Sequence, residues 1–181
     1  MSDLPQRDAR VVWHPYTQHG IESEPLPVSR AQGAWLELAD GRRLLDGISS
    51  WWATLHGHSH PALVAAISEQ AARLDHVLFA GATHEPAVQL AEELLQVVPD
   101  GLSRVFYSDD GSTAVEAAIK MVLQSWVHRD QPERRVFLAM DGAYHGDTFG
   151  AMAASDPDPF FLPFQPLMFE VRRVVATQES L

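Results

Sequence analysis

The feature that most constrains the fold is a strand–helix–strand pattern between residues 105 and 140. Residues 112–127 place apolar side chains at helical spacing, and the apolar runs at residues 105–107 and 135–140 have the length of short buried strands. A strand, a helix and a second strand at this spacing are typical of a βαβ unit, in which the crossover is right-handed and the strands are parallel. The sequence therefore predicts an α/β fold built on a parallel sheet.

Weaker patterns predict the elements outside this unit. Residues 1–30 are rich in proline and polar side chains and lack periodicity, so they predict an extended arm. The pair Asp40-Gly41 lies between two short strand patterns, which indicates a hairpin, and two helices are expected to begin at prolines. The expected elements are strands at residues 34–38, 43–46 and 168–175, and helices at residues 61–74 and 86–98.

Charge and composition exclude several classes of function. The chain has 13 basic and 24 acidic residues and a formal net charge of −11, so the phosphate backbone of a nucleic acid would be repelled. It has no cysteine, which excludes a disulfide scaffold and a thiolate metal site. The first ten residues include Asp3, Arg7, Asp8 and Arg10 with no apolar run behind them, and no apolar stretch of the chain approaches membrane-spanning length. We therefore expect a cytoplasmic protein with neither a nucleic-acid nor a membrane partner.

Two loops occupy the positions where a parallel sheet binds ligands, beyond the carboxyl ends of its strands. Gly111-Ser112 begins the long helix, and a glycine, free amides and a hydroxyl at a helix start can bind a phosphate. Residues 141–148 follow the next strand, so Tyr144 would bring an aromatic ring to the same edge. A phosphorylated heteroaromatic such as pyridoxal phosphate would suit this pair. An ordinary capped helix start and a packed loop tyrosine are the alternatives.

Three alternating histidines, His56, His58 and His60, could share one face of a strand and bind a metal. Gly57 and Pro61 instead indicate a loop that enters a helix, and no cysteine or carboxylate stands at the usual ligand spacing. The sequence therefore predicts no metal site, and places these histidines in a loop near the ligand pocket.

Five segments of the chain resemble, in order, the diaminopelargonate synthase branch of the class III pyridoxal-phosphate aminotransferases. They are residues 13–17 (WHPYT), 46–52 (DGISSWW), 56–61 (HGHSHP), 111–116 (GSTAVE) and 144–152 (YHGDTFGAM). The helix start and the Tyr-His-Gly loop are similar to class III enzymes in general. The arm motif and the paired tryptophans are similar to the biotin-pathway branch in particular.

The resemblance implies a fold type I transferase that uses pyridoxal 5′-phosphate and forms a homodimer. Residues 1–55 would be the arm and hairpin of the small domain, and residues 56–181 the first, incomplete part of the large domain. The implied reaction moves an amino group from S-adenosylmethionine to 8-amino-7-oxononanoate. The implied cofactor-binding residues are Gly111, Ser112, Tyr144 and His145, and the implied substrate-binding residues are Tyr16, Trp51, Trp52, Tyr144 and Asp147.

Two features depart from the family pattern. Asp110 stands where the family has a small hydroxyl residue, and a carboxylate beside a phosphate is unfavourable unless it turns away or is paired. The only lysine, Lys120, lies in mid-helix one turn after Glu116, where a surface ion pair is expected. The family's aldehyde-binding lysine is thus not matched here.

We therefore expect the 181-residue chain alone to lack transaminase activity. The alternative functions are another class III omega-aminotransferase and a non-catalytic phosphate-binding or interaction module.

Overall fold

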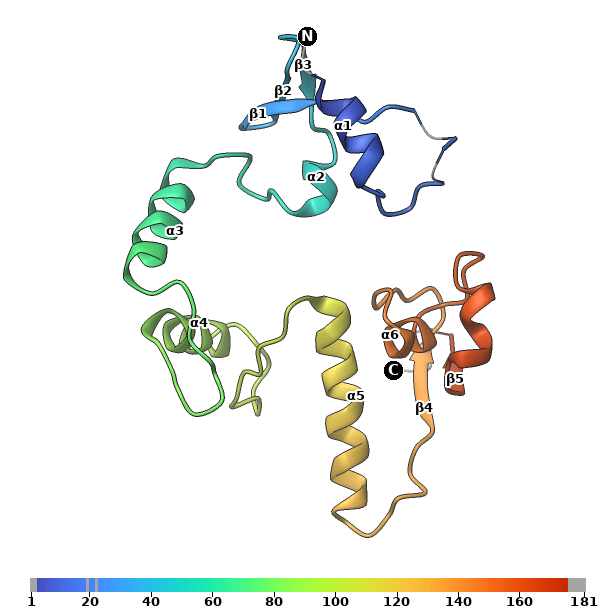
Figure 1. The fold of residues 1–181 in the computed structure, drawn as a ribbon. Coiled ribbons are helices and arrows are strands. Elements are labelled where there is room, and N and C mark those ends of the chain that lie inside the picture. The colour runs from blue at the N-terminus through green and yellow to red at the C-terminus, as the bar shows by residue number, and fades with distance from the viewer. Residues whose placement is uncertain (1–2, 19, 22, 176–181) are drawn as a thin grey trace. The chain divides into compact units, whose positions relative to one another are not determined.

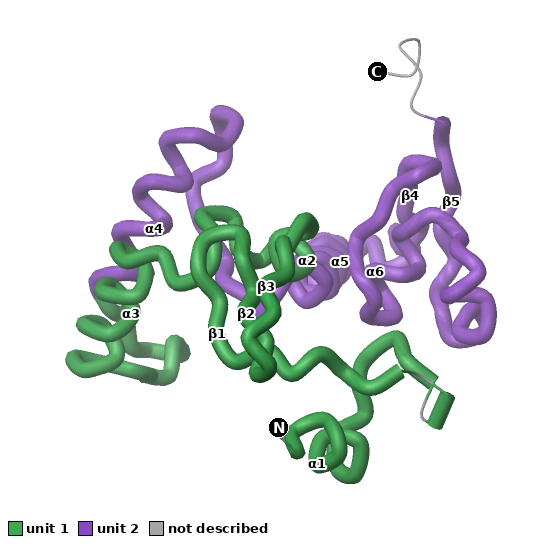
Figure 2. The backbone as a smooth tube through the Cα atoms, turned by 90° about the horizontal axis from the view of Figure 1, so that it is seen from above, with its two compact units in different colours: residues 1–84 green, residues 85–181 purple. Residues whose placement is uncertain are grey.

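The computed structural model divides into two compact units, Met1–His84 and Glu85–Leu181 (Figure 1, Figure 2). Each unit has its own small sheet and is described by itself. The domain boundary expected after residue 55 stays a prediction. Among the described residues, no helix combines the length and the apolar character needed to cross a membrane. The structure describes residues 3–18, 20–21 and 23–175.

The first unit is built on a three-stranded antiparallel sheet in the order β1-β2-β3. Its elements are α1 (Leu4–Val11), β1 (Val28–Gln32), β2 (Trp35–Leu38), β3 (Arg43–Leu45), α2 (Ser49–Trp52) and α3 (Pro61–Arg73). The pairing of β2 with β3 confirms the expected hairpin, and α3 begins at the expected proline. The prediction of an extended arm is wrong at α1 and β1. The reason is that α1 has too few apolar residues for visible periodicity, and β1 is a strand because it pairs with β2.

The turn between β2 and β3 explains why its sequence signal is reliable. Gly41 has φ +88°, and its N–H donates to the carbonyl of Leu38 at 2.9 Å. The carboxylate of Asp40 accepts from the backbone N–H and the Nε of Arg42, and these bonds hold the pKa of Asp40 below its ordinary value. Leu38 is the fully buried side chain of this sheet.

The second unit contains the parallel sheet, in which β4 and β5 pair from Phe137 opposite Val171 to Met140 opposite Val174. Its elements are α4 (Glu85–Leu95), α5 (Gly111–Val127), β4 (Phe137–Met140), α6 (Phe149–Ala154), the 3-10 helix η1 (Leu162–Leu167) and β5 (Val171–Val174). The α/β class, the parallel sheet and the helix over residues 112–127 are confirmed. The helix expected over residues 86–98 ends three residues early.

The expected strand at residues 105–107 is wrong, and so is the βαβ unit that depended on it. Val105 and Phe106 make no ladder hydrogen bonds with the described residues, and the side chain of Phe106 is exposed. A three-residue apolar run becomes a strand only when a neighbouring strand supplies those bonds. The crossover between parallel strands lies instead after β4, through α6 and η1 to β5 (Figure 1).

The core of the second unit is formed by α6. Four of its six residues, Gly150–Ala153, are buried, as are Ala139 of β4 and Ser155 after the helix. α6 packs against both α5 and β4. This helix was not expected from the sequence, because six residues are too few to establish a helical period. Its burial fixes the end of the loop that precedes it, residues 141–148.

Candidate functional site

The start of α5 lies in direct contact with the loop that leads into α6. Gly146 in that loop has φ +118°, and a Cβ atom built on it would lie 2.4 Å from both Cβ and Oγ of Ser112. Side-chain atoms do not approach so closely, so only glycine fits at this position. The expected meeting of the Gly-Ser helix start with the Tyr144 loop is therefore found.

Hydrogen bonds reinforce this contact. The backbone N–H of Thr148 donates to Oγ of Ser112 at 3.0 Å, and the two hydroxyl oxygens of Ser112 and Thr148 lie 2.8 Å apart. Both side chains are half-buried. Two adjacent hydroxyl groups, Ser112 in the first turn of α5 and Thr148 before α6, thus lie near the exposed residue Gly111 at the start of α5. We call Gly111, Ser112 and Thr148 the anion cup.

A second contact joins the same segments one turn further along α5. The backbone N–H of Gly150 donates to Oε1 of Glu116 at 2.6 Å. A Cβ atom on Gly150 would lie 2.5 Å from Oε2 of the same carboxylate. The expected ion pair between Glu116 and Lys120 is wrong, because the carboxylate turns to the buried amide; among the described residues it pairs with no cation, and Lys120 is exposed.

Asp110 is paired, as the sequence required if an anion is to bind nearby. Its Oδ1 accepts from the backbone N–H of Thr113 at 2.7 Å, and its own N–H donates to Oγ1 of Thr113 at 3.0 Å. This is a reciprocal capping box, and the Thr113 amide holds the pKa of Asp110 below its ordinary value. The carboxylate is ionised and remains at the helix start, so it adds a negative charge beside the anion cup.

Tyr144 is presented at the surface by an anchored loop. Its side chain is 66% exposed, and its hydroxyl donates to Oδ1 of Asp147 at 3.1 Å. Partial burial and, secondly, the Asp147 carboxylate raise the pKa of Tyr144. The backbone N–H of His145 donates to Oγ of the buried Ser155 at 2.8 Å, while the His145 side chain is exposed. The backbone is held and the ring faces outward, as a stacking platform requires.

In the first unit, two expected substrate-binding residues contact each other. The rings of Tyr16 and Trp51 have centroids 5.3 Å apart and are tilted by 50°. Trp51 belongs to α2, where all four residues, Ser49–Trp52, have φ between +47° and +67°. We call this left-handed segment the aromatic turn. Trp52 lies in it and is exposed. Such a run of non-glycine residues is strained and must be held by its surroundings.

Asp46 supplies that support. Its Oδ1 accepts from the backbone N–H of Ser50 at 2.9 Å, and its Oδ2 accepts from the Ser50 hydroxyl at 2.7 Å. Nε2 of His58 also lies 2.7 Å from Oδ2. The Ser50 amide, His58 and the Ser50 hydroxyl lower the pKa of Asp46 to about 2. His58 is itself fixed, because its backbone N–H and carbonyl both pair with Gly33.

The three alternating histidines do not point to one centre. His58 turns to Asp46, whereas the rings of His56 and His60 lie near each other, with centroids 6.0 Å apart and a tilt of 58°. Within the part of the chain that the structure describes, no three histidine or carboxylate side chains are grouped as metal ligands.

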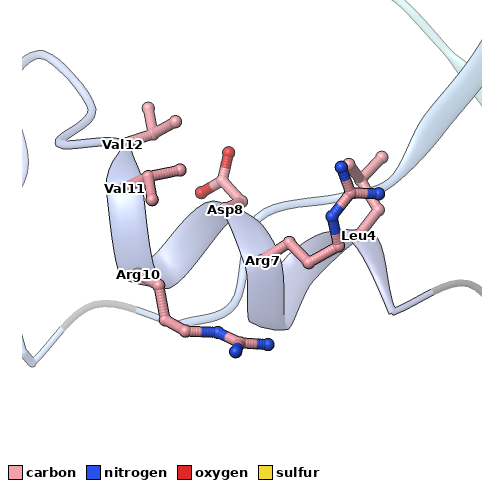
Figure 3. Close-up of a pocket in the computed structure, with 6 residues that line it drawn as sticks. All are labelled: Leu4, Arg7, Asp8, Arg10, Val11 and Val12. Atoms are coloured by element: carbon pink, nitrogen blue, oxygen red, sulfur yellow. The ribbon is translucent and has the colours of Figure 1, made fainter.

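A surface hollow lies away from all of these positions. It has a volume of about 410 Å³ and lies along α1, and Figure 3 shows that its lining comes from this helix and the residue after it. The lining residues are Leu4, Arg7, Asp8, Arg10, Val11 and Val12. None of them is an expected site residue, and a hollow with a single helix as its wall does not enclose a ligand.

The structure therefore groups the expected residues into two sets, one in each unit. Tyr16, Trp51 and Trp52 lie in the first, and the other expected residues lie in the second. Sequence reasoning missed Asp46, Glu116 and the contacting glycines. The matched spacing of S-x-x-x-E at residues 112–116 and G-x-x-x-G at residues 146–150 was the available signal. The individual roles of the expected site residues stay predictions.

Comparison with known proteins places the chain in a family. Residues 16–181 match the Aminotransferase class-III family. Adenosylmethionine-8-amino-7-oxononanoate aminotransferase from Synechococcus elongatus is 56% identical over 160 residues, which are 88% of this chain and 38% of the relative. The enzyme of the same name from Geobacter sulfurreducens is 43% identical over 90% of this chain and 36% of its own. The chain belongs to the class-III aminotransferases.

Solved structures give the same result. The crystal structure of adenosylmethionine-8-amino-7-oxononanoate aminotransferase from Methanocaldococcus jannaschii matches with a TM-score of 0.89 and 38% identity, over 97% of this chain and 41% of the other. An omega transaminase from Pseudomonas jessenii, solved in complex with PMP, matches with a TM-score of 0.87 and 26% identity, over 97% of this chain and 39% of the other. The chain thus has the amino-terminal fold of these transaminases and spans about two fifths of their length.

Proposed function

We propose that this chain is the amino-terminal part of the aminotransferase that moves an amino group from S-adenosylmethionine to 8-amino-7-oxononanoate in biotin biosynthesis. The names of the relatives and the motif at residues 46–52 support this assignment. The observation that carries the proposal is the contact of Ser112 with Gly146 and Thr148, which joins a helix start to an aromatic loop. In the whole enzyme we expect a cytoplasmic homodimer.

The residues of the second unit fit pyridoxal 5′-phosphate. The exposed Gly111 backbone and the hydroxyls of Ser112 and Thr148 would hold the phosphate at the positive end of α5. Tyr144 would cover one face of the pyridine ring, and His145 would lie at its edge. Asp147 would keep Tyr144 in place through their hydrogen bond. When bound, the cofactor supplies the chemistry by which an amino group passes from donor to acceptor.

In the first unit, the aromatic side chains fit the two substrates. Tyr16, Trp51 and Trp52 would line the substrate pocket, where flat apolar walls suit a long aliphatic keto acid and the faces of aromatic rings attract a sulfonium cation. The contact between Tyr16 and Trp51 would form one such wall.

Amino-group transfer also needs a lysine that faces the cofactor aldehyde. Lys120 is exposed on α5 and does not belong to the anion cup. These 181 residues alone would therefore bind the cofactor without catalysing amino-group transfer. The similarity to omega transaminases makes another amino acceptor the alternative. The higher identity to the biotin enzymes, 38% against 26% among the structures, favours the first proposal.

Pyridoxamine 5′-phosphate is the appropriate probe, because it carries the ring and the phosphate but no aldehyde that could react with Lys120. Titrated into the isotopically labelled chain, it should shift the backbone resonances of Gly111, Ser112 and Thr148 and the ring resonances of Tyr144. Shifts confined to other parts of the chain, or no saturable binding, would refute the proposal. Adding S-adenosylmethionine and 8-amino-7-oxononanoate to the chain with pyridoxal 5′-phosphate should give no 7,8-diaminononanoate.

A further inference from the structure

The contact between α5 and α6 is formed at two points that share one spacing. Ser112 and Glu116 lie four residues apart, so they project from the same side of α5. Each receives one backbone N–H from the opposite segment, Ser112 from Thr148 and Glu116 from Gly150. Two points of attachment fix orientation as well as distance, which one bond cannot do.

At the second point, Glu116 replaces the ordinary cap of α6. Thr148 is the residue that precedes α6, where a threonine side chain would ordinarily accept a hydrogen bond from the first turn of its own helix. Here it does not, and its hydroxyl lies instead beside the hydroxyl of Ser112. Glu116 takes over the capping role by accepting from the Gly150 amide at 2.6 Å. The exchange leaves the threonine hydroxyl at the anion cup and still satisfies α6.

The loop that carries Tyr144 is held by this arrangement at its carboxyl end. Gly146 touches Ser112, and at the other end the Asp156 N–H donates to the carbonyl of Ala143 at 2.6 Å. If the start of α6 moved away from α5, Thr148 and Gly146 would move with it. Tyr144 lies two residues before Gly146, so the loop that carries it would lose its support on this side.

We propose that Glu116 is a positioning residue that holds the Tyr144 loop on α5 and thereby sets the place of the tyrosine ring relative to a phosphate in the anion cup. This inference rests on the proposed cofactor function. Glu116 touches no ligand in it, and acts only through the Gly150 amide. Its removal should therefore weaken recognition of the ring far more than recognition of a free phosphate, because Gly111 and Ser112 stay on α5 and Thr148 alone would leave the anion cup.

The geometry provides two independent ways to disturb the contact. Glu116→Ala removes the acceptor, whereas Glu116→Gln keeps an oxygen that can accept from Gly150. Gly150→Ala leaves Glu116 in place but puts a methyl group where the carboxylate now lies. Gly150 does not need a positive φ, so this variant tests the contact without adding backbone strain. Glu93→Ala, an exposed carboxylate on α4, is the matched control.

The test compares the dissociation constants of pyridoxamine 5′-phosphate and of inorganic phosphate for each variant. Glu116→Ala and Gly150→Ala should weaken pyridoxamine phosphate about tenfold and inorganic phosphate less than about threefold, since one charged hydrogen bond is lost and Thr148 alone of the anion cup is displaced. Glu116→Gln and Glu93→Ala should stay within about twofold of the unmodified chain for both ligands. Equal weakening of both ligands by Glu116→Ala, or no weakening of either, would overturn the proposal.

Amide hydrogen exchange without ligand keeps the two proposals separable. Exchange at Gly150 and Thr148 should be faster in Glu116→Ala and unchanged in Glu116→Gln. If the unmodified chain fails to bind pyridoxamine phosphate, the cofactor function fails, and with it the part of the inference that concerns the ring. Unchanged exchange at these amides in Glu116→Ala would refute the claim that Glu116 holds the loop on α5, whatever the ligand affinities are.

Discussion

The two sets of candidate site residues are held by opposite means. In the first unit, a carboxylate holds four non-glycine residues in a left-handed turn, and Trp51 contacts Tyr16 as a result. In the second unit, the absence of side chains at Gly146 and Gly150 lets a loop touch a helix. One arrangement depends on a charged group that opposes strain, and the other on close backbone contact. They should therefore respond differently to substitution and to pH.

The largest effect is expected from Gly146→Ala. The positive φ of Gly146 disfavours any residue with a side chain, and the new methyl group would also clash with the Ser112 side chain. We expect a loss of about 2–4 kcal/mol in the free energy of unfolding of the second unit. The affinity for pyridoxamine phosphate should fall at least about tenfold. Denaturant-induced unfolding would measure the stability, and a ligand titration would measure the affinity.

Gly101→Ala is the matched control for this change. Gly101 also has a positive φ, +93°, but a Cβ atom added to it would meet no atom within 4 Å, so only the strain of about 1–2 kcal/mol applies. Equal effects from the two variants would mean that contact with Ser112 does not matter, and the contrast between the units would be lost.

The next largest effect is expected from Asp46→Ala in the first unit. Without the carboxylate, the Ser50 amide loses its acceptor and the Ser50 hydroxyl keeps only its 3.4 Å contact with Nε2 of His58, so the aromatic turn should leave its left-handed conformation. The indole N–H resonance of Trp51 should shift and the contact with the Tyr16 ring should be lost in nuclear Overhauser spectra. Asp40→Ala, which removes a similar bond pattern from a turn held by glycine, should leave both signals unchanged. A persistent Trp51–Tyr16 contact in Asp46→Ala would show that packing holds the turn.

The aromatic turn of the first unit should also respond to pH, because it is held by a carboxylate. The pKa of Asp46 is lowered from 3.8 to about 2, so its ionised form favours the folded turn. That stabilisation is complete above pH 3.8 and is lost as the pH falls through about 2. Following the Trp51 resonance over this range should reveal a transition that Asp46→Asn lacks. A transition of the same midpoint in Asp46→Asn would assign the change to other carboxylates.

The sequence predicted the local features that neighbouring residues determine and missed those that depend on distant residues. The helix start at Gly111-Ser112 and the turn at Asp40-Gly41 could be read from the sequence, because each is fixed by residues within one turn of the chain. The aromatic turn could not, because serine and tryptophan have no local preference for positive φ and adopt it only through Asp46 and His58.

The errors in the second unit have a related cause. The apolar run at residues 105–107 predicts a strand, but a strand needs a partner, and none of the described segments pairs with it. The acceptor role of Glu116 was hidden because its partner, Gly150, is 34 residues away. Local pairing with Lys120 was the simpler expectation, and a buried amide that needed an acceptor overrode it.

A smaller effect, and a gain, is expected at Asp110. Its carboxylate caps α5 but also places a negative charge beside the anion cup. Asp110→Ser should keep a capping hydroxyl and remove the charge, so binding of inorganic phosphate should tighten roughly three- to tenfold. Added salt should reduce the difference between the two chains by screening the charge. Unchanged affinity at low salt would show that the capped carboxylate does not act on the cup.

The smallest effect is expected from Tyr144→Phe, and it separates the ring from its hydroxyl. Stacking on a cofactor ring uses the face of the aromatic system, which phenylalanine retains. The hydrogen bond from the Tyr144 hydroxyl to Asp147 is exposed, so its loss should change the affinity for pyridoxamine phosphate by less than about twofold. Tyr144→Ala should lower that affinity about tenfold, because it removes the face itself. If the two variants weakened binding equally, the hydroxyl and its bond to Asp147 would be the recognising element. The second unit would then also depend on a carboxylate, and the contrast with the aromatic turn would have to be abandoned.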